Sequence, residues 1–172
     1  MRIGVISDSH YTTGQALPPL QEMFQGVAAI LHAGDVGDNA FLTALQQIAP
    51  TYHVAGNCDR IPLAFAWPRQ QVVELGGYRI GLVHGDGPGN VSTPKRAYQI
   101  FQNQQVQAIV FGHSHDPLCQ TMDDGVLLFN PGSISRPLGK VPQKSYGILT
   151  LGAVSYTHLA PFSLQYDRIP PG

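Results

Sequence analysis

Charged residues, cysteines and long apolar runs are all scarce in this chain of 172 residues. Only 12% of the residues are charged, and the balance of 10 Lys and Arg against 11 Asp and Glu gives a formal net charge of −1. A chain this close to neutral has no general electrostatic attraction for nucleic acid or for an anionic membrane. Its apolar stretches also fall short of the ~20 residues that a membrane-spanning helix needs. We therefore expect neither nucleic acid nor a membrane as a partner.

Cysteine is nearly absent, and the two cysteines, Cys58 and Cys119, form no CxxC motif. Such usage is typical of a protein whose thiols remain reduced. The first apolar stretch reaches Asp8 and His10 too early to be the apolar region of a secretory signal. These features predict a cytoplasmic protein.

Apolar side chains and turn residues are plentiful by contrast. Hydrophobic residues make up 43% of the chain, which is enough for a substantial core, and the length suits a single domain over residues 1–172. Glycine and proline are frequent, at 19 and 14 residues, and indicate many turns between short elements.

The first third of the sequence alternates between strand and helix patterns. Short apolar runs predict strands over 2–7, 28–33 and 52–55. Apolar residues at helical spacing predict helices over 17–27 and from Asn39, as the cap, to Ile48. Alternation of this kind predicts parallel strands joined by right-handed crossovers.

The rest of the sequence predicts hairpins, one helix and one further buried strand. An irregular connection over 60–71 leads to a Gly-Gly hairpin; the later elements are a helix over 93–104, a strand over 108–111 and the strand pairs 118–122/126–129 and 146–151/154–157. Together the elements predict two packed sheets, one mostly parallel and one mixed, with helices outside.

Five apolar runs end in polar residues with oxygen or nitrogen ligand atoms. These residues are Asp8, His10, Asp35, Asn57, His84, His113 and His115. Ligands of α/β sheets bind outside the carboxyl ends of the strands, so the seven side chains are expected to converge. Together they are sufficient for two divalent metal ions without a sulfur ligand.

Each of these residues also has a simpler interpretation. Asp8 and Asp35 alone suit turns or helix caps, Asn57 suits a positive-φ turn, and single histidines are often satisfied core residues. Coincidence at five strand ends is much harder to accept, so we favour the metal interpretation.

The motifs Asp8-x-His10, Gly34-Asp35, Gly56-Asn57, His84-Gly85 and Gly112-His113-x-His115 resemble, in this order, those of the calcineurin-like metallophosphoesterase superfamily. The spacing and the segment Asn130-Pro131-Gly132-Ser133 are most similar to its small single-domain branch of bacterial and archaeal phosphodiesterases, to which the eukaryotic retromer subunit is related. The resemblance implies an α/β fold, a four-layer α/β/β/α sandwich with two mixed sheets flanked by helices.

The same resemblance implies a dinuclear metal site. Asp8, His10, Asp35 and His115 would hold one ion, and Asp35, Asn57, His84 and His113 the other, with Asp35 as the bridge. Two divalent ions, two carboxylates and a bridging hydroxide leave a charge near +1, which suits a phosphodiester monoanion. Manganese is our first choice of metal, with Fe, Ni or Zn as alternatives, since such ligands suit all four.

We predict catalytic roles for Asp35, Asn57 and His113, and contact with substrate for Cys58 and for Arg136, which follows Ser133 and Ser135 in a Gly-rich loop. Cys58 stands where many members of the superfamily have histidine. A thiol is a weak hydrogen-bond donor and a poor acid, so we expect modest turnover and a preference for good leaving groups. We interpret Cys58 as a small buried residue rather than a nucleophile.

Several other polar residues have two interpretations. Asp59, Asp86 and Asp116 either orient the imidazoles or cap loops, and Arg136 either contacts a phosphate or is solvated. His32 is expected in the core, and His53 and His158 are expected to be structural or on the surface.

The function predicted from all of these features is a metal-dependent phosphodiesterase acting on a small-molecule or nucleotide-like phosphodiester. The alternative is a non-catalytic metal-binding scaffold resembling the retromer subunit, with an apolar patch near Leu63–Trp67. Self-association as a homo-oligomer stays open.

Overall fold

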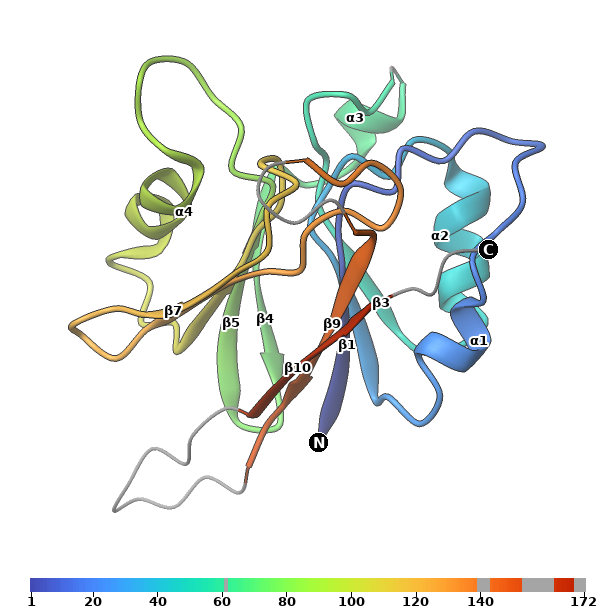
Figure 1. Cartoon of the computed structure of the whole chain (residues 1–172). Helices are drawn as coiled ribbons and strands as arrows, with labels where there is room; N and C mark the ends of the chain where they lie inside the picture. Colours follow the sequence, from blue (N-terminus) through green and yellow to red (C-terminus); the bar gives the residue numbers. More distant parts are fainter. Residues whose placement is uncertain (61, 139–142, 153–162, 169–172) are drawn as a thin grey trace.

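Two five-stranded sheets face each other and carry helices on their outer surfaces (Figure 1). The computed structural model describes residues 1–60, 62–138, 143–152 and 163–168. The two facing sheets with helices on their outer surfaces form the predicted α/β/β/α sandwich. None of the helices in these ranges is both long and apolar enough to cross a lipid bilayer.

The first sheet has the strand order β10-β9-β1-β2-β3. Its strands are β1 (Arg2–Ile6), β2 (Ala29–His32), β3 (Thr51–His53), β9 (Ser145–Thr150) and β10 (Ser163–Arg168). The predicted parallel pairs β1/β2 and β2/β3 are present, while β9 runs antiparallel to both β1 and β10.

The second sheet has the order β4-β5-β6-β8-β7. Its strands are β4 (Gln70–Leu75), β5 (Tyr78–Val83), β6 (Ala108–Val110), β7 (Leu118–Thr121) and β8 (Leu127–Asn130). β5, β6 and β8 are parallel, and the two hairpins β4/β5 and β7/β8 are antiparallel as predicted. Both sheets are therefore mixed, and the expectation of one mostly parallel sheet was wrong.

The helices are shorter than their sequence patterns predicted. The helix expected over 17–27 is the single turn α1 (Leu20–Met23), because Pro18 and Pro19 precede it and Gly26 has φ +72°. The helix from Asn39 is α2 (Asn39–Gln46), but its cap is Asp38, whose carboxylate accepts a hydrogen bond from the Ala40 N–H. The third predicted helix is α4 (Thr93–Phe101).

Two further regions differ from expectation. The stretch over 60–71 is not wholly irregular, since it contains the one-turn helix α3 (Leu63–Ala66) and the start of β4. The strand expected over 154–157 lies outside the described residues. Within the described part of the chain, the partner of β9 on its outer side is β10, which we did not predict.

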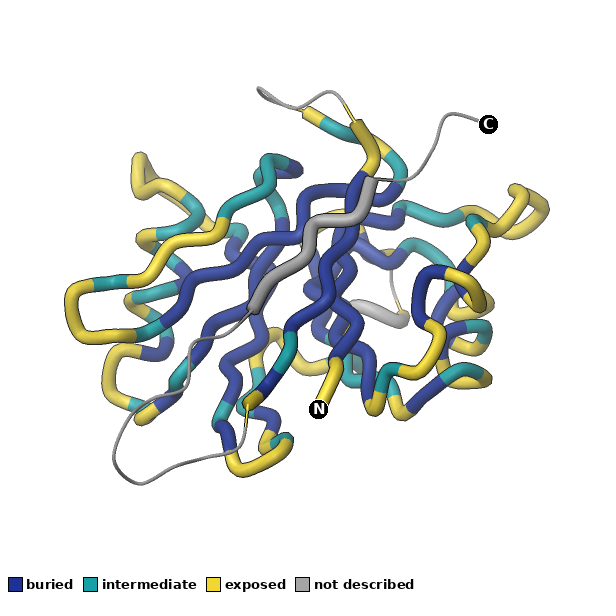
Figure 2. The backbone as a smooth tube through the Cα atoms, turned by 60° about the horizontal axis from the view of Figure 1, so that its bottom comes forward, coloured by how far each residue is buried: buried dark blue, intermediate teal, exposed yellow. Residues whose placement is uncertain are grey.

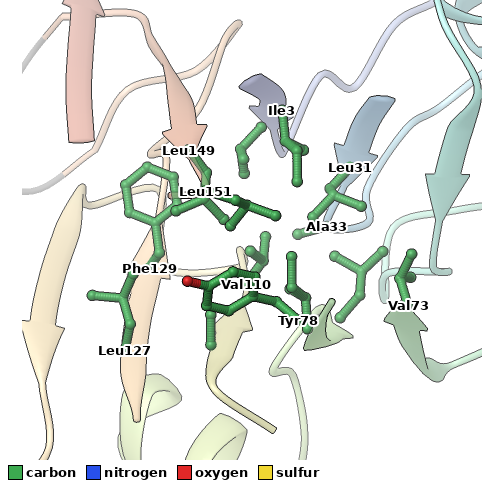
Figure 3. Packing of buried hydrophobic residues seen from close by; sticks show 14 of the residues in the cluster. Ile3, Leu31, Ala33, Val73, Tyr78, Val110, Leu127, Phe129, Leu149 and Leu151 are labelled. Atoms are coloured by element: carbon green, nitrogen blue, oxygen red, sulfur yellow. The ribbon is translucent and has the colours of Figure 1, made fainter. Parts of the chain in front are cut away.

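Three apolar clusters hold the layers together. The largest lies between the sheets, where Ile3, Leu31 and Leu149 face Val110 and Phe129 (Figure 3). The other two clusters lie under α1 and α2 and under α4. Buried strands form the centre of the molecule, and most exposed residues are in the connecting loops (Figure 2). A rigid core of this kind fixes where each strand ends, and therefore where the loops begin.

Candidate metal centre

Five of the seven predicted ligand residues have left-handed backbone conformations. Among the described residues, the non-glycine positions with positive φ are Asp8, His10, Asp35, His113, His115 and Gln105, with φ between 43° and 66°. Such conformations are uncommon for residues with a Cβ atom and concentrate at functional sites. The chain thus turns sharply where β1, β2 and β6 end and directs these side chains to one place.

Asp8, His10, Asp35 and His115 form a compact cluster. Each offers a ligand atom within 4.8 Å of the others. The Nε2 atoms of His10 and His115 lie 3.2 Å apart, and His115 Nε2 is 3.1 Å from Asp8 Oδ1. The family resemblance implied that these four residues hold one ion, and the structure brings them together.

The donor set of this cluster fits a divalent cation. Asp8 Oδ1 is buried, and no hydrogen bond satisfies it within the described part of the chain. Burying an unsatisfied carboxylate oxygen is costly unless a cation compensates for it. Two imidazole nitrogens that face each other at hydrogen-bond distance also suit a shared cation.

The remaining three predicted ligands, Asn57, His84 and His113, gather around His84 beside Asp35. Asp35 Oδ2 lies 3.4 Å from His84 Nε2, and Asn57 Oδ1 lies 3.2 Å from the same nitrogen. The His113 ring packs edge-on against the His84 ring, with their centroids 5.2 Å apart. All seven residues therefore surround one spot at the carboxyl ends of β1, β2, β3, β5 and β6.

The two carboxylates strongly perturb the nearby His84. Burial disfavours its charged form, but the hydrogen bond to Asp35 and the charges of Asp8 and Asp35 outweigh this effect and raise the pKa of His84 to about 9. Burial likewise acts against ionisation of Asp35, yet the hydrogen bond and charge of His84 hold the pKa of that carboxyl well below its usual range. Excess negative charge in a buried cluster is what a bound cation would neutralise.

Burial and the nearby carboxylates also shift the pKa values of the other three imidazoles, in different directions. Burial lowers the pKa of His10 and His113, although the neighbouring carboxylates oppose it. The Asp8 carboxylate beside it raises the pKa of His115. His10 and His113 are therefore ready as neutral ligands, whereas His84, with a pKa of about 9, must first lose a proton.

Glycines next to the ligands leave room for them. A Cβ atom on Gly56 would overlap Asp35, and one on Gly112 would overlap the Ser7 hydroxyl and lie 2.7 Å from Asp8 Oδ2. Neither glycine has a positive φ. Close approach of neighbouring strands, rather than backbone freedom, therefore requires glycine at these two positions.

Backbone carbonyls, not carboxylates, orient the buried rings. His84 Nδ1 bonds to the Ala33 carbonyl at 2.7 Å and His115 Nδ1 to the Arg136 carbonyl at 2.5 Å. Each contact aims Nε2 into the site. The interpretation of Asp59 as an imidazole partner was wrong, because its carboxylate accepts hydrogen bonds from the backbone N–H groups of Asp35, Gly37 and Gly56. It is the loop cap of the alternative interpretation.

Asp86 and Asp116 also make contacts other than with imidazoles. The Asp86 carboxylate pairs with Arg69 at 2.6 Å, and the Asp116 N–H donates to the Ser114 hydroxyl at 3.4 Å.

The segment from Asn130 to Arg136 supports the site from behind. Asn130 donates to the Gly112 carbonyl at 2.9 Å, and the hydroxyls of Ser133 and Ser135 donate to the Asp8 carbonyl at 2.8 and 2.9 Å. These supporting roles were missed by sequence reasoning, which used the Asn-Pro-Gly-Ser motif only as a mark of resemblance. Ser7 was missed as well; its hydroxyl donates to Asp8 Oδ2 at 2.6 Å.

Cys58 is exposed, so its interpretation as a small buried residue was wrong. Its N–H donates to Asp35 Oδ1 at 2.8 Å, which places it at the mouth of the site. Partial loss of solvent around the thiol, together with the hydrogen bond and charge of Asp35, raises the pKa of the thiol to about 11. The group is therefore a neutral thiol at pH 7 and not a nucleophilic thiolate.

The Arg136 side chain is exposed, while its backbone holds His115. Its positive charge reaches His10 and disfavours protonation there. His32 is fully buried, as expected, and its Nε2 hydrogen-bonds to the Ser9 hydroxyl at 2.8 Å. His53 is partly buried against Trp67, and His158 lies outside the described residues.

Comparison with known proteins agrees with this geometry. Residues 1–153 match the model of the calcineurin-like phosphoesterase superfamily domain. A probable metallophosphoesterase of Methanothermobacter thermautotrophicus is 36% identical over 80% of this chain and 79% of its own length. Phosphodiesterase YfcE of Escherichia coli K12 is 36% identical over 56% of this chain and 50% of its own.

A solved structure has the same fold as this chain. Wild-type Vps29 of Entamoeba histolytica, complexed with Zn²⁺, superposes with a TM-score of 0.74 and 20% identity, covering 98% of this chain and 99% of that one. At this identity the match concerns the fold alone. With the family match over most of the chain and the clustered ligands of the superfamily, the protein belongs to the calcineurin-like phosphoesterase superfamily.

Proposed function

We propose that this protein is a metal-dependent phosphodiesterase with a centre for two divalent cations. The observation that carries the proposal is the position of one oxygen atom. Asp35 Oδ2 lies 3.7 Å from His10 Nε2 in the first group of ligands and 3.4 Å from His84 Nε2 in the second. A carboxylate between two sets of ligands suits a bridge between two cations.

Asp8, His10, Asp35 and His115 would hold one cation, and Asp35, Asn57, His84 and His113 the other. When bound, a pair of divalent cations supplies an acidified water as nucleophile and positive charge for the phosphoryl oxygens. We propose manganese as the metal, with Fe, Ni or Zn as alternatives, because imidazole and carboxylate ligands do not discriminate strongly among them.

The chain's own residues would place the substrate. Asn57 and Cys58 are exposed at the mouth, and the exposed Arg136 side chain carries a positive charge toward His10. A guanidinium group there suits a phosphate oxygen. The low net charge of such a centre favours a phosphodiester monoanion from a small molecule or nucleotide over a phosphomonoester dianion. Both described cysteines are free thiols, which supports a cytoplasmic location.

The test combines metal analysis with hydrolysis of a chromogenic aryl phosphodiester. We expect the purified protein to be active, to lose activity on chelation and to regain it with Mn²⁺. Asp35→Asn is expected to abolish turnover, while Glu74→Gln, a substitution on the distant β4/β5 hairpin, leaves it unchanged. Activity that survives chelation, or no activity with any divalent metal, contradicts the proposal.

The alternative function as a binding scaffold is favoured by one specific observation. Phe65 in α3 is 81% exposed and Leu138 is 57% exposed. A contiguous exposed apolar patch is typical of a protein-binding surface, and the scaffold function requires Phe65 to belong to such a patch. A Phe65→Ser variant that keeps full phosphodiesterase activity but no longer binds a protein partner would support a scaffold role beside the enzymatic one.

A further inference from the structure

Arg69 connects two loops that belong to different sheets. One guanidinium nitrogen, Nη1, donates to the Gly56 carbonyl at 3.1 Å, and the other, Nη2, pairs with Asp86 Oδ2 at 2.6 Å. Gly56 immediately precedes Asn57 after β3, and Asp86 follows His84 by two residues after β5. A planar guanidinium holds two such acceptors at fixed relative positions.

The backbone at Arg69 is anchored at the same place. The Ala55 N–H donates to the Pro68 carbonyl at 2.8 Å, so the residue before Arg69 lies beside the end of β3. The backbone before Arg69 is therefore fixed beside the end of β3, and the Arg69 side chain extends from there to Asp86, which follows β5. The Asp86 side chain is only 17% exposed, whereas that of Arg69 is 54% exposed.

Within the described residues, the contacts of the Arg69–Asp86 ion pair lie beside the ligands Asn57, His84 and His113. Asn57 and His84 touch each other at 3.2 Å, and the negative charge of Asp86 acts on His113. Together with the bridging Asp35, Asn57, His84 and His113 are the ligands assigned to the second cation. The ligands Asp8 and His115 have separate support from Ser133, Ser135 and the Arg136 carbonyl.

We propose that Arg69 is a positioning residue that holds the Asn57 and His84 loops together for the second cation. This inference rests on the proposed two-cation centre. In the described part of the chain, Arg69 bonds to Gly56 and Asp86 rather than to the proposed ligands, so its effect is indirect. Residues that orient metal ligands typically change metal affinity by 10- to 100-fold when they are removed.

The test is titration of the metal-stripped protein with Mn²⁺ by calorimetry. The wild type is expected to bind two ions. Arg69→Met is expected to bind the first as the wild type does and the second about 10- to 100-fold more weakly. Arg69→Lys should also weaken binding of the second ion, because a lysine ammonium cannot hold both acceptors in the way a planar guanidinium does. Electron paramagnetic resonance should show isolated Mn²⁺ in the variants where the wild type shows a coupled pair.

Arg79→Met is the matched control. Arg79 also forms an ion pair at 2.6 Å, with Glu74, and also donates to a backbone carbonyl, that of Gln104. It lies at the opposite end of β5, and its loss should leave both Mn²⁺ affinities unchanged. Both arginines are on the surface, where an ion pair contributes little to stability, so the unfolding temperature of the metal-free variants should stay close to that of the wild type.

The outcomes separate the two proposals. Arg69→Met protein that binds two ions as tightly as the wild type overturns the role of Arg69 and leaves the two-cation centre intact. Equal weakening of both ions also overturns it, because a general loss of structure would explain that result. A wild type that binds a single ion contradicts the two-cation centre itself, and the role of Arg69 with it.

Discussion

The Ser133 hydroxyl donates a hydrogen bond to the Asp8 carbonyl at 2.8 Å, although the two residues are 125 positions apart in the chain. The Ser133 Oγ atom also accepts hydrogen bonds from the backbone N–H groups of Ser135 and Arg136, at 3.2 and 2.8 Å. One buried side chain thus joins the turn that carries Asp8 to the loop whose backbone orients His115.

Replacement of the Ser133 hydroxyl should weaken binding of the first cation. Ser133→Ala leaves two N–H groups without their acceptor, which is expected to cost about 1–3 kcal/mol in the free energy of unfolding. We expect Mn²⁺ affinity at the first group to fall by about 10-fold, the lower value for loss of such support. Urea unfolding and calorimetry check the two effects. Ser135→Ala, which removes a donor to Asp8 but no loop acceptor, should do less; equal effects would contradict this explanation.

Glycine at position 56 should be essential for metal binding. The Cβ of Gly56→Ala would overlap Asp35 and force its carboxylate away from His10 and His84. Metal analysis should find the variant protein folded but unable to retain a cation pair. Gly125→Ala is the control, since Gly125 has φ +85° but open space around it. That variant should lose about 1 kcal/mol of stability from backbone strain and keep its metals.

Cation binding should release protons near neutral pH. The pKa of His84 is raised to about 9, so its imidazole is protonated at pH 7 in the metal-free protein and must lose that proton to become a ligand. Calorimetry in buffers of different ionisation enthalpy should report release of about one proton per protein at pH 7 from this group. The release should vanish as the pH rises above about 9. No dependence on the buffer at pH 7 would contradict the assignment of His84 as a ligand.

Histidine in place of Cys58 should improve hydrolysis of esters with poor leaving groups. The Cys58 thiol, with a pKa of about 11, is a weak donor at the mouth of the site. An imidazolium there could protonate the leaving oxygen, and general acid catalysis contributes on the order of 10²-fold or more. Turnover of an alkyl phosphodiester by Cys58→His should rise more than turnover of a nitrophenyl diester. Equal changes with both substrates would exclude a leaving-group effect.

The stability of the protein should fall in acid because of His32. Burial, with the nearby charges of His53 and His84, lowers the pKa of His32 to about 3. As the pH falls, His32 therefore takes up a proton in the unfolded chain before it does so in the folded chain. The contribution of neutral His32 to the free energy of unfolding is complete above about pH 6.5 and is lost as the pH falls toward 3. At pH 5 the loss is about 2 kcal/mol. Urea unfolding should show a smaller difference between pH 7 and pH 5 for His32→Gln; an unchanged difference would contradict the prediction.

Local sequence patterns predicted most strands because short apolar runs bounded by glycine or proline have few alternatives in a packed sheet. Helix lengths were less predictable. The apolar spacing from Leu17 to Val27 is helical, yet Pro19 and Gly26 limit α1 to one turn. β10 was missed because Gly152-Ala153 suggested a tight turn leading directly to a partner strand over 154–157, whereas the described partner of β9 is Ser163–Arg168.

The sequence by itself determined which residues can form the site, since seven oxygen and nitrogen ligands follow strand ends and parallel strands end at one edge. Only the tertiary structure decided what holds and surrounds them: the exposure of Cys58, the backbone contacts of Asp59, the Ser133 bond to Asp8 and the Arg69 pair with Asp86. Ligand type is a property of single residues, whereas support arises from contacts between loops of different strands, which form only when the two sheets pack together.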